Sequence, residues 1–298
     1  MTISYGSVAS PLMRNPRDRP RQEKGDDSDS DDGYLSYEEL VKRADGFTVP
    51  YDDQRGYRGT ELMFLSFARP HMRAFHGSWI CLFVSLCVQY AIPPLLPEIK
   101  ASLKLTKADV WLSNVWSTVG GVPFLFMLGP LSDKHGGRLM STALLACIAI
   151  PCALSGLVTS IEGLLLVRLL IGCLDNSVPC QYWISCHFVR EISGTAMAIS
   201  SGLGATGSGV IQLVIGSILF SFCLLLTGDN PDLAWRLALV FPALLSFVTA
   251  TFFYFCSEDC PLGNHKEVKS AGLMMERSAI DSFRSGALNL NSWILFLQ

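Results

Sequence analysis

The sequence predicts an all-α integral membrane protein. Half of its 298 residues are hydrophobic, only 16% are charged, and the mean hydropathy is positive, which is far from the balance of a soluble domain. Between His76 and Cys256 the chain carries several apolar runs, each of roughly 20 residues, the length that crosses a bilayer core as a helix. Short polar connectors separate these runs, so we expect a multi-pass helical bundle.

The first 68 residues have a different composition. The stretch "NPRDRPRQEKGDDSDSDDGYLSYEEL" is charged, rich in Asp and Ser and low in apolar residues, so we expect residues 1–68 to form a disordered acidic tail. This tail lacks the short apolar core of a secretory signal peptide, so the first spanning helix is expected to act as an uncleaved signal. The acidic run at 26–32 is either a solvated tail or a phosphorylation or docking segment.

Six spans are predicted within residues 69–256. The first ends in Pro93, Pro94 and Pro97, which stop or kink a helix, and the Asn-Pro of "TGDNPDLA" marks the turn before the sixth. Residues 257–290 are expected to form a polar interdomain loop, and residues 291–298 the start of a seventh span. Because seven apolar residues cannot cross a bilayer, we expect the chain to be a fragment. The predicted spans are 77–99, 110–131, 139–158, 161–188, 194–226 and 235–256.

Lys and Arg residues predict the orientation. They precede the first span, lie between the second and third spans and between the fourth and fifth, and follow the sixth. All of these segments lie on one side of the predicted bundle. Loops rich in Lys and Arg stay in the cytoplasm. The connector with Lys100, Lys104 and Lys107 is an exception, partly offset by Glu98 and Asp109. We therefore expect a multi-pass protein of the plasma membrane with a cytoplasmic N-terminus.

The ten cysteines do not indicate a disulfide framework. Most of them fall inside apolar spans, where cysteine behaves as a small buried hydrophobe, and no CxxC or HxxxH spacing occurs. The sequence also shows no pairing of a nucleophile with a base. We expect no enzyme activity, no metal site, no cofactor and no nucleic-acid partner.

A motif between the second and third spans, "GPLSDKHGGRLM" at 129–140, resembles the cytoplasmic motif of the major facilitator superfamily. In that family the loop packs a helix end closely and holds a latch from Asp to Arg and the helix dipole, which breaks as the transporter changes state. The resemblance assigns these roles to Gly129, Asp133 and Arg138, and a carboxylate is favourable at a helix N-terminus and near Arg. The alternative is a bare hairpin with a surface ion pair.

Two charged residues, Arg168 and Asp175, lie more than one turn inside the fourth predicted span. An arginine there, Arg168, is expensive and needs a partner or a wet cavity, unless it snorkels to the outer interface. Asp175 lies deeper and is one of very few acids in the spans. It could pair with Arg168 as a structural bridge or titrate as a proton-coupling site.

The fourth and fifth spans also supply polar and small residues. Gln181 and Tyr182 could line a central cavity or the cytoplasmic exit, or could belong to an aromatic belt at the interface. In "SGLGATGSGVIQ", 201–212, small residues recur every four positions on more than one face, which favours a helix wedged between two neighbours. The same residues would also let a small substrate approach the backbone. The candidates in this segment are Ser201, Gly204, Thr206 and Ser208.

Several segments, in order and spacing, resemble the nitrate/nitrite porter family of the major facilitator superfamily, especially its algal and plant members. They are "RAFHGSWICLFVSL", "IPPLLPEI", "VPCQYW", "SGLGATGSG" and "SEDCPLGN". The resemblance covers 69–298 and implies the N-terminal six-helix half of a twelve-helix transporter that moves nitrate or nitrite by alternating access, with proton coupling in eukaryotic members. This sequence departs from the family pattern at two positions: Leu125 stands where the family has an arginine, and Ala205 stands where it has an asparagine.

The sequence therefore leaves three functional hypotheses. The first is a nitrate or nitrite transporter whose C-terminal half lies elsewhere. The second is a non-transporting relic or regulatory membrane partner of a full-length porter, favoured by the loss of a guanidinium at Leu125, since a guanidinium is the natural ligand of a planar oxyanion. The third is a transporter with an altered, less charged substrate.

Overall fold

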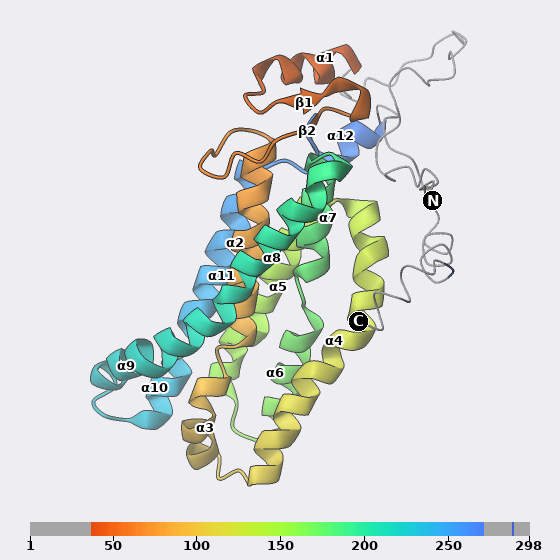
Figure 1. Cartoon of the computed structure of the whole chain (residues 1–298). Coiled ribbons are helices and arrows are strands. Elements are labelled where there is room, and N and C mark those ends of the chain that lie inside the picture. Colours follow the sequence, from red (N-terminus) through yellow and green to blue (C-terminus); the bar gives the residue numbers. More distant parts are fainter. Residues whose placement is uncertain (1–36, 271–287, 289–298) are drawn as a thin grey trace, which may run out of the picture.

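The computed structural model of the chain describes residues 37–270 and Leu288, and most of them lie in a bundle of long helices (Figure 1). Five helical stretches are long and apolar enough to cross a membrane, and they match five of the six predicted spans. The fourth predicted span has no such continuous counterpart. The five stretches are His71–Ser102, Lys107–His135, Gly137–Leu157, Arg190–Leu226 and Pro231–Cys256.

Helix boundaries follow local sequence signals. Thr106 and Asp109 form a capping box, in which each side chain accepts a hydrogen bond from the other residue's backbone N–H, and α4 begins there. Asn230 caps α10 ahead of Pro231, and its side-chain oxygen accepts from the backbone N–H groups of Asp232 and Leu233. The bundle comprises α2 (His71–Gln89), α3 (Leu96–Ser102), α4 (Lys107–His135), α5 (Gly137–Leu154), α6 (Ile161–Cys173), α7 (Ser177–His187), α8 (Arg190–Leu213), α9 (Phe220–Leu226), α10 (Pro231–Ala238) and α11 (Val240–Cys256).

The helices pack as three main pairs: α2 with α8, α4 with α6, and α5 with α11. Glycines make two of these contacts close. A β-carbon at Gly172 of α6 would overlap the backbone carbonyl of Ser117 in α4, and one at Gly207 of α8 would overlap that of Phe83 in α2. Close backbone approach between small residues is how helices associate in lipid, where burial from water gives no driving force.

The fourth predicted span is two helices, so the prediction of one continuous helix is wrong. α6 ends at Cys173 and α7 starts at Ser177. In a continuous helix the ring of Pro179 would clash with the carbonyl of Asp175, four residues earlier. Instead, the Asp175 carboxylate accepts a hydrogen bond from the backbone N–H of Ser177 at 2.6 Å, which satisfies a free donor of the first turn of α7.

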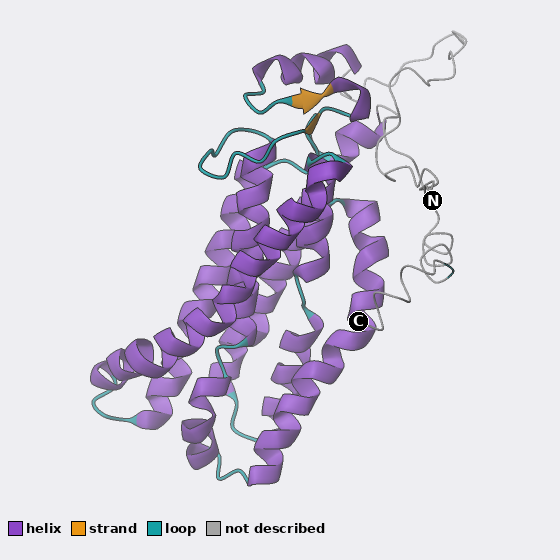
Figure 2. Cartoon of the chain, in the orientation of Figure 1, coloured by secondary structure: helices purple, strands orange, loops and turns teal. Residues whose placement is uncertain are grey.

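The predicted disorder of residues 1–68 is wrong for residues 37–68. This segment forms α1 (Tyr37–Lys42) and a hairpin of β1 (Tyr51–Asp52) and β2 (Arg58–Gly59), and it covers one end of the bundle together with α12 (His265–Ser270) (Figure 2). Leu40 and Ala44 sit one turn apart and pack against Cys260 and Leu262. Averaging the composition over the whole tail hid these buried apolar residues. We call this end, formed by 37–68 and 257–270, the capped end. Residues 1–36 lie outside the described residues.

Candidate functional site

The turn between α4 and α5 is built on two consecutive glycines. Gly136 has a φ of +92°, and a β-carbon there would lie 2.7 Å from Oδ1 of Asp259. A β-carbon at Gly137 would lie 2.7 Å from the backbone of Trp183. Only glycine fits both positions, so α5 begins directly against α7 and against the residues that follow α11.

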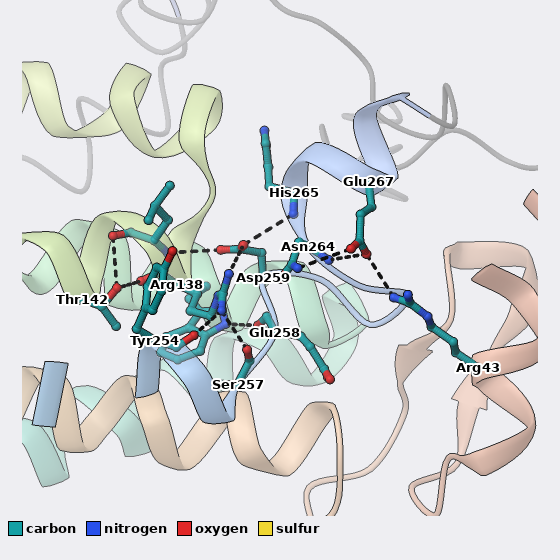
Figure 3. A network of polar contacts seen from close by, with 12 residues as sticks. Arg43, Arg138, Thr142, Tyr254, Ser257, Glu258, Asp259, Asn264, His265 and Glu267 are labelled. Carbon is teal, nitrogen blue, oxygen red and sulfur yellow. Dashed lines mark hydrogen bonds and ion pairs between the residues drawn. The ribbon is translucent and has the colours of Figure 1, made fainter. Parts of the chain in front are cut away.

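Arg138 binds the last turn of α11 and the residues that follow it (Figure 3). Its Nη1 donates to the carbonyls of Tyr254 and Ser257, and its Nη2 forms an ion pair with Oδ2 of Asp259 at 3.3 Å. Asp259 is only 3% exposed and also accepts from the backbone N–H groups of Leu139, at 3.2 Å, and of His265, at 3.4 Å. We call Arg138, Leu139, Asp259 and His265 the Asp259 network.

The Asp259 network supplies the chemistry that the sequence motif predicts, with a different carboxylate. Asp259 bonds both the arginine and an N–H in the first turn of α5, where the helix dipole favours a negative charge. Arg138 therefore reaches the segment after α11 and pairs with the carboxylate of Asp259 there. The predicted close packing at Gly129 is not found among the described residues, where a β-carbon at that position would meet no atom within 4 Å. Gly136 and Gly137 take that role.

The rest of the capped end ties the N-terminal segment to the same loop. Arg43 donates to the carbonyl of Leu262 at 3.1 Å and pairs with Glu267 at 3.0 Å (Figure 3). The indole N–H of Trp183 donates to the carbonyl of Glu258 at 2.8 Å. The capped end is thus one connected unit joining α1, α5, α7 and α12.

Burial and hydrogen bonding shift the pKa values of three groups in this unit. It lowers the pKa of His265, an effect that the charge of Asp259 opposes, and it lowers the pKa of Arg58. The pKa of the Cys260 thiol lies well above its ordinary value, first because of its hydrogen bond with Cys186 and then because of burial. His265 is therefore held neutral next to Asp259.

Arg168 and Asp175 do not form the predicted bridge. The guanidinium of Arg168 is buried and donates to the side-chain oxygen of Asn114 in α4, whereas Asp175 caps α7. Arg168 therefore joins α6 to α4 and does not snorkel outward. Asn114 was missed from the sequence, although a polar residue in an apolar span is itself a signal of a buried partner.

The small-residue helix α8 has one closely packed side. A β-carbon at Gly204 would lie 2.6 Å from the side chain of Leu82 in α2, and Ser200 shares a hydrogen bond with Ser78 of α2 at 3.3 Å. By contrast, β-carbons at Gly202 and Gly209 would meet no atom within 4 Å. Within the described residues, α8 packs closely against α2 and also contacts α7.

A second side of α8 carries polar groups next to α7. Nε2 of Gln181 donates to Oγ of Ser201 at 3.4 Å, and Ala205 and Ser208 follow Ser201 at helical spacing on the same side. We call Gln181, Ser201, Ala205 and Ser208 the α7–α8 edge. Two other candidates lie elsewhere: Thr206 is about 140° around the helix axis from Ser201, and Tyr182 packs against the apolar cluster at the capped end.

No metal site is assembled within the described residues, where no group of three His, Cys, Asp or Glu side chains could hold an ion. All ten cysteines are free. The polar side chains of the α7–α8 edge are an amide and hydroxyls, which are neutral donors and acceptors.

The fold and these sites define a multi-pass membrane protein built from paired helices with a latched helix turn at one end. The profile of the Major Facilitator Superfamily matches residues 78–297, and the chain belongs to that superfamily. Within it, the chain resembles the nitrate/nitrite porters, which are transporters and not enzymes.

The similar proteins include nitrate transporters of plants and algae. They include high-affinity nitrate transporter 2.3 of Oryza sativa subsp. japonica, 32% identical over 84% of this chain and 48% of that protein. High affinity nitrate transporter 2.7 of Arabidopsis thaliana is 33% identical over 84% of this chain and 52% of that protein. Nitrate transporter 2.1 of Chlamydomonas reinhardtii is 31% identical over 87% and 48%. The chain spans about half the length of the curated relatives it matches.

Proposed function

We propose that the chain is the N-terminal half of a nitrate or nitrite transporter that works by alternating access. In this half α6 and α7 together complete a sixth crossing. The helices least buried in the structure are α4 and α8, and a second half packing on them would explain why their apolar and small residues lie open. The capped end then faces the cytoplasm at the plasma membrane, where the positive loops gather.

The observation that carries this proposal is the α7–α8 edge. It combines an amide and hydroxyls with small residues on a side of α8 that the described part of the chain leaves open. N–H and O–H donors suit the oxygens of nitrate or nitrite, and small residues let an anion approach the helix closely. The nitrate transporters to which the chain is similar support the same substrate.

Isotopic nitrate uptake tests the proposal. The chain would be joined to the second half of one of its plant relatives, and uptake measured across a range of imposed pH gradients, with the unjoined chain as control. Uptake above that control that rises with an inward proton gradient would support proton-coupled transport. Absence of uptake in every gradient would refute transport of nitrate.

A second measurement tests the anion site itself. Leu125 and Ala205 are exposed side chains of α4 and α8, so both can be enlarged without disturbing the packing of this half. Leu125→Arg combined with Ala205→Asn should raise nitrate affinity by about tenfold, because one charge-assisted bidentate contact contributes roughly 1.5–3 kcal/mol. Leu125→Lys is the control, since it adds charge without the fork. Unchanged affinity would mean that the anion binds elsewhere.

Leu125 itself favours a second candidate function, a non-transporting membrane partner of a full-length porter. A leucine offers no hydrogen bond to an oxyanion, and the open sides of α4 and α8 could contact a porter instead. Co-purification of the chain with a co-expressed full-length relative would support this function. A chain that remains monodisperse beside the porter would rule it out.

A further inference from the structure

The loop between β2 and α2 exposes a cluster of large apolar side chains. Leu65 is 98% exposed and Phe67 is 56% exposed, and Met63 and Phe64 next to them are also exposed. Four such residues within five positions form a contiguous apolar patch, which marks an interaction surface and not an ordinary loop. We call residues 63–67 the apolar loop.

The apolar loop is folded back along α2. The carbonyl of Ser66 accepts a hydrogen bond from Nε2 of His76 at 3.1 Å, and the ring of Phe67 stacks on the His76 imidazole at 4.3 Å. The other ring nitrogen of His76 accepts from the indole N–H of Trp79 at 3.0 Å. These bonds fix a neutral His76 tautomer and hold the apolar loop in one position beside the second turn of α2.

The level of the apolar loop along the bundle can be read from α11, because α11 runs antiparallel to α2 and packs beside it. Arg73 donates to the carbonyl of Cys256, the last residue of α11, at 2.9 Å. A β-carbon at Gly77 would lie 3.0 Å from the ring of Phe253. His76 therefore lies level with Phe253, about one turn inside the end of α11. Next to Phe253 in sequence, Phe252 is exposed, and Phe255 is 75% exposed.

We propose that the apolar loop inserts into the boundary between headgroups and acyl chains of the leaflet at the capped end. Its side chains lie at the level of the exposed phenylalanines of α11, so they continue the apolar surface of a membrane-spanning bundle. In Figure 1 the loop stands on the side of α2 away from α4. The exposed Arg69 follows the loop in sequence, and arginine side chains at such a boundary can reach lipid phosphates. The loop thus fixes the N-terminal segment against the membrane surface.

Tryptophan quenching in vesicles tests the insertion. Leu65→Trp would be reconstituted in phosphatidylcholine vesicles with and without lipid brominated near the glycerol end of its acyl chains. Lys42→Trp, an exposed site on α1 at the tip of the capped end (Figure 1), is the matched control. The emission of the six native tryptophans is subtracted with the unsubstituted chain. We expect brominated lipid to remove several times more emission at residue 65 than at residue 42, and aqueous iodide to show the reverse order.

Two outcomes would overturn the proposal. Iodide quenching at residue 65 as strong as at residue 42 would place the apolar loop in water. Protection from both quenchers, together with chemical cross-linking of the chain to itself, would show that a second copy covers the loop. Because Leu65 is almost fully exposed, the substitution removes no packing, and an unchanged melting temperature in detergent confirms that the variant is folded.

Discussion

At the scale of single residues, Asp259 holds the capped end together. Its carboxylate bonds Arg138, the first turn of α5 and the first residue of α12, so one buried charge joins three segments that are distant in sequence. A buried ion pair contributes little compared with apolar residues of the same shape, yet losing one of its charges leaves the other uncompensated. In a transporter that changes state, such a pair can hold one conformation and release it when the loop moves.

Asp259→Asn should therefore lower the free energy of unfolding by about 3 kcal/mol, because the Arg138 charge would keep only neutral partners in a largely buried position. The measurement is thermal and denaturant unfolding in detergent. Glu191→Gln is the control, since its ion pair with Arg55 is exposed, and we expect no resolved change there. Equal losses in the two variants would show that Asp259 contributes no more than a surface charge.

The sequence could predict that a carboxylate meets Arg138 and a helix N-terminus at this turn, but not which carboxylate. Asp133 is near in sequence, whereas Asp259 lies 121 positions from Arg138 and arrives only when α11 packs beside α5. For the same reason Asn114 was not predicted as the partner of Arg168. Local motifs specify the kind of contact, and the tertiary fold selects the residue that makes it.

At the scale of elements, glycine position matters more than glycine number. α8 contains Gly202, Gly204, Gly207 and Gly209, yet only Gly204 and Gly207 face a close neighbour in the described part of the chain. The composition predicted close packing of this helix, and in the structure the close packing lies on the side of α8 that faces α2. The break between α6 and α7 was readable in principle from Asp175, Asn176 and Pro179, but their apolar surroundings suggested one long span.

Gly207→Ala and Gly209→Ala are matched substitutions that separate these two sides of α8. At position 207 the added methyl group would overlap the carbonyl of Phe83, so α2 and α8 must move apart, and we expect a loss of about 2 kcal/mol. At position 209 the methyl group meets nothing within 4 Å, and we expect no loss. Unfolding in detergent measures both. A similar effect of the two variants would mean that α2 and α8 are not in close contact.

At the scale of the whole molecule, hydropathy was sufficient to predict the all-α membrane fold, since apolar runs of bilayer length have few alternatives. It did not predict the capped end, because residues 37–68 bury only a few apolar side chains, such as Leu40 and Val49, among many charged ones. These short elements are stable because the end of the bundle provides a surface to pack on, a property of the folded molecule and not of the segment.

In the proposed complete transporter, the α7–α8 edge would face the anion path or the second half of the protein. Ala205 lies exposed on the α7–α8 edge, so Ala205→Trp should leave the melting temperature of this chain unchanged. In the transporter completed with a second half, the same indole would stand where small residues must face the anion path or the opposing helices, and nitrate uptake should fall to the level of the unjoined chain. Phe255→Trp, on the exposed side of α11, controls for bulk and should change neither quantity. Full uptake by the Ala205→Trp transporter would show that the second half and the anion path lie away from this edge.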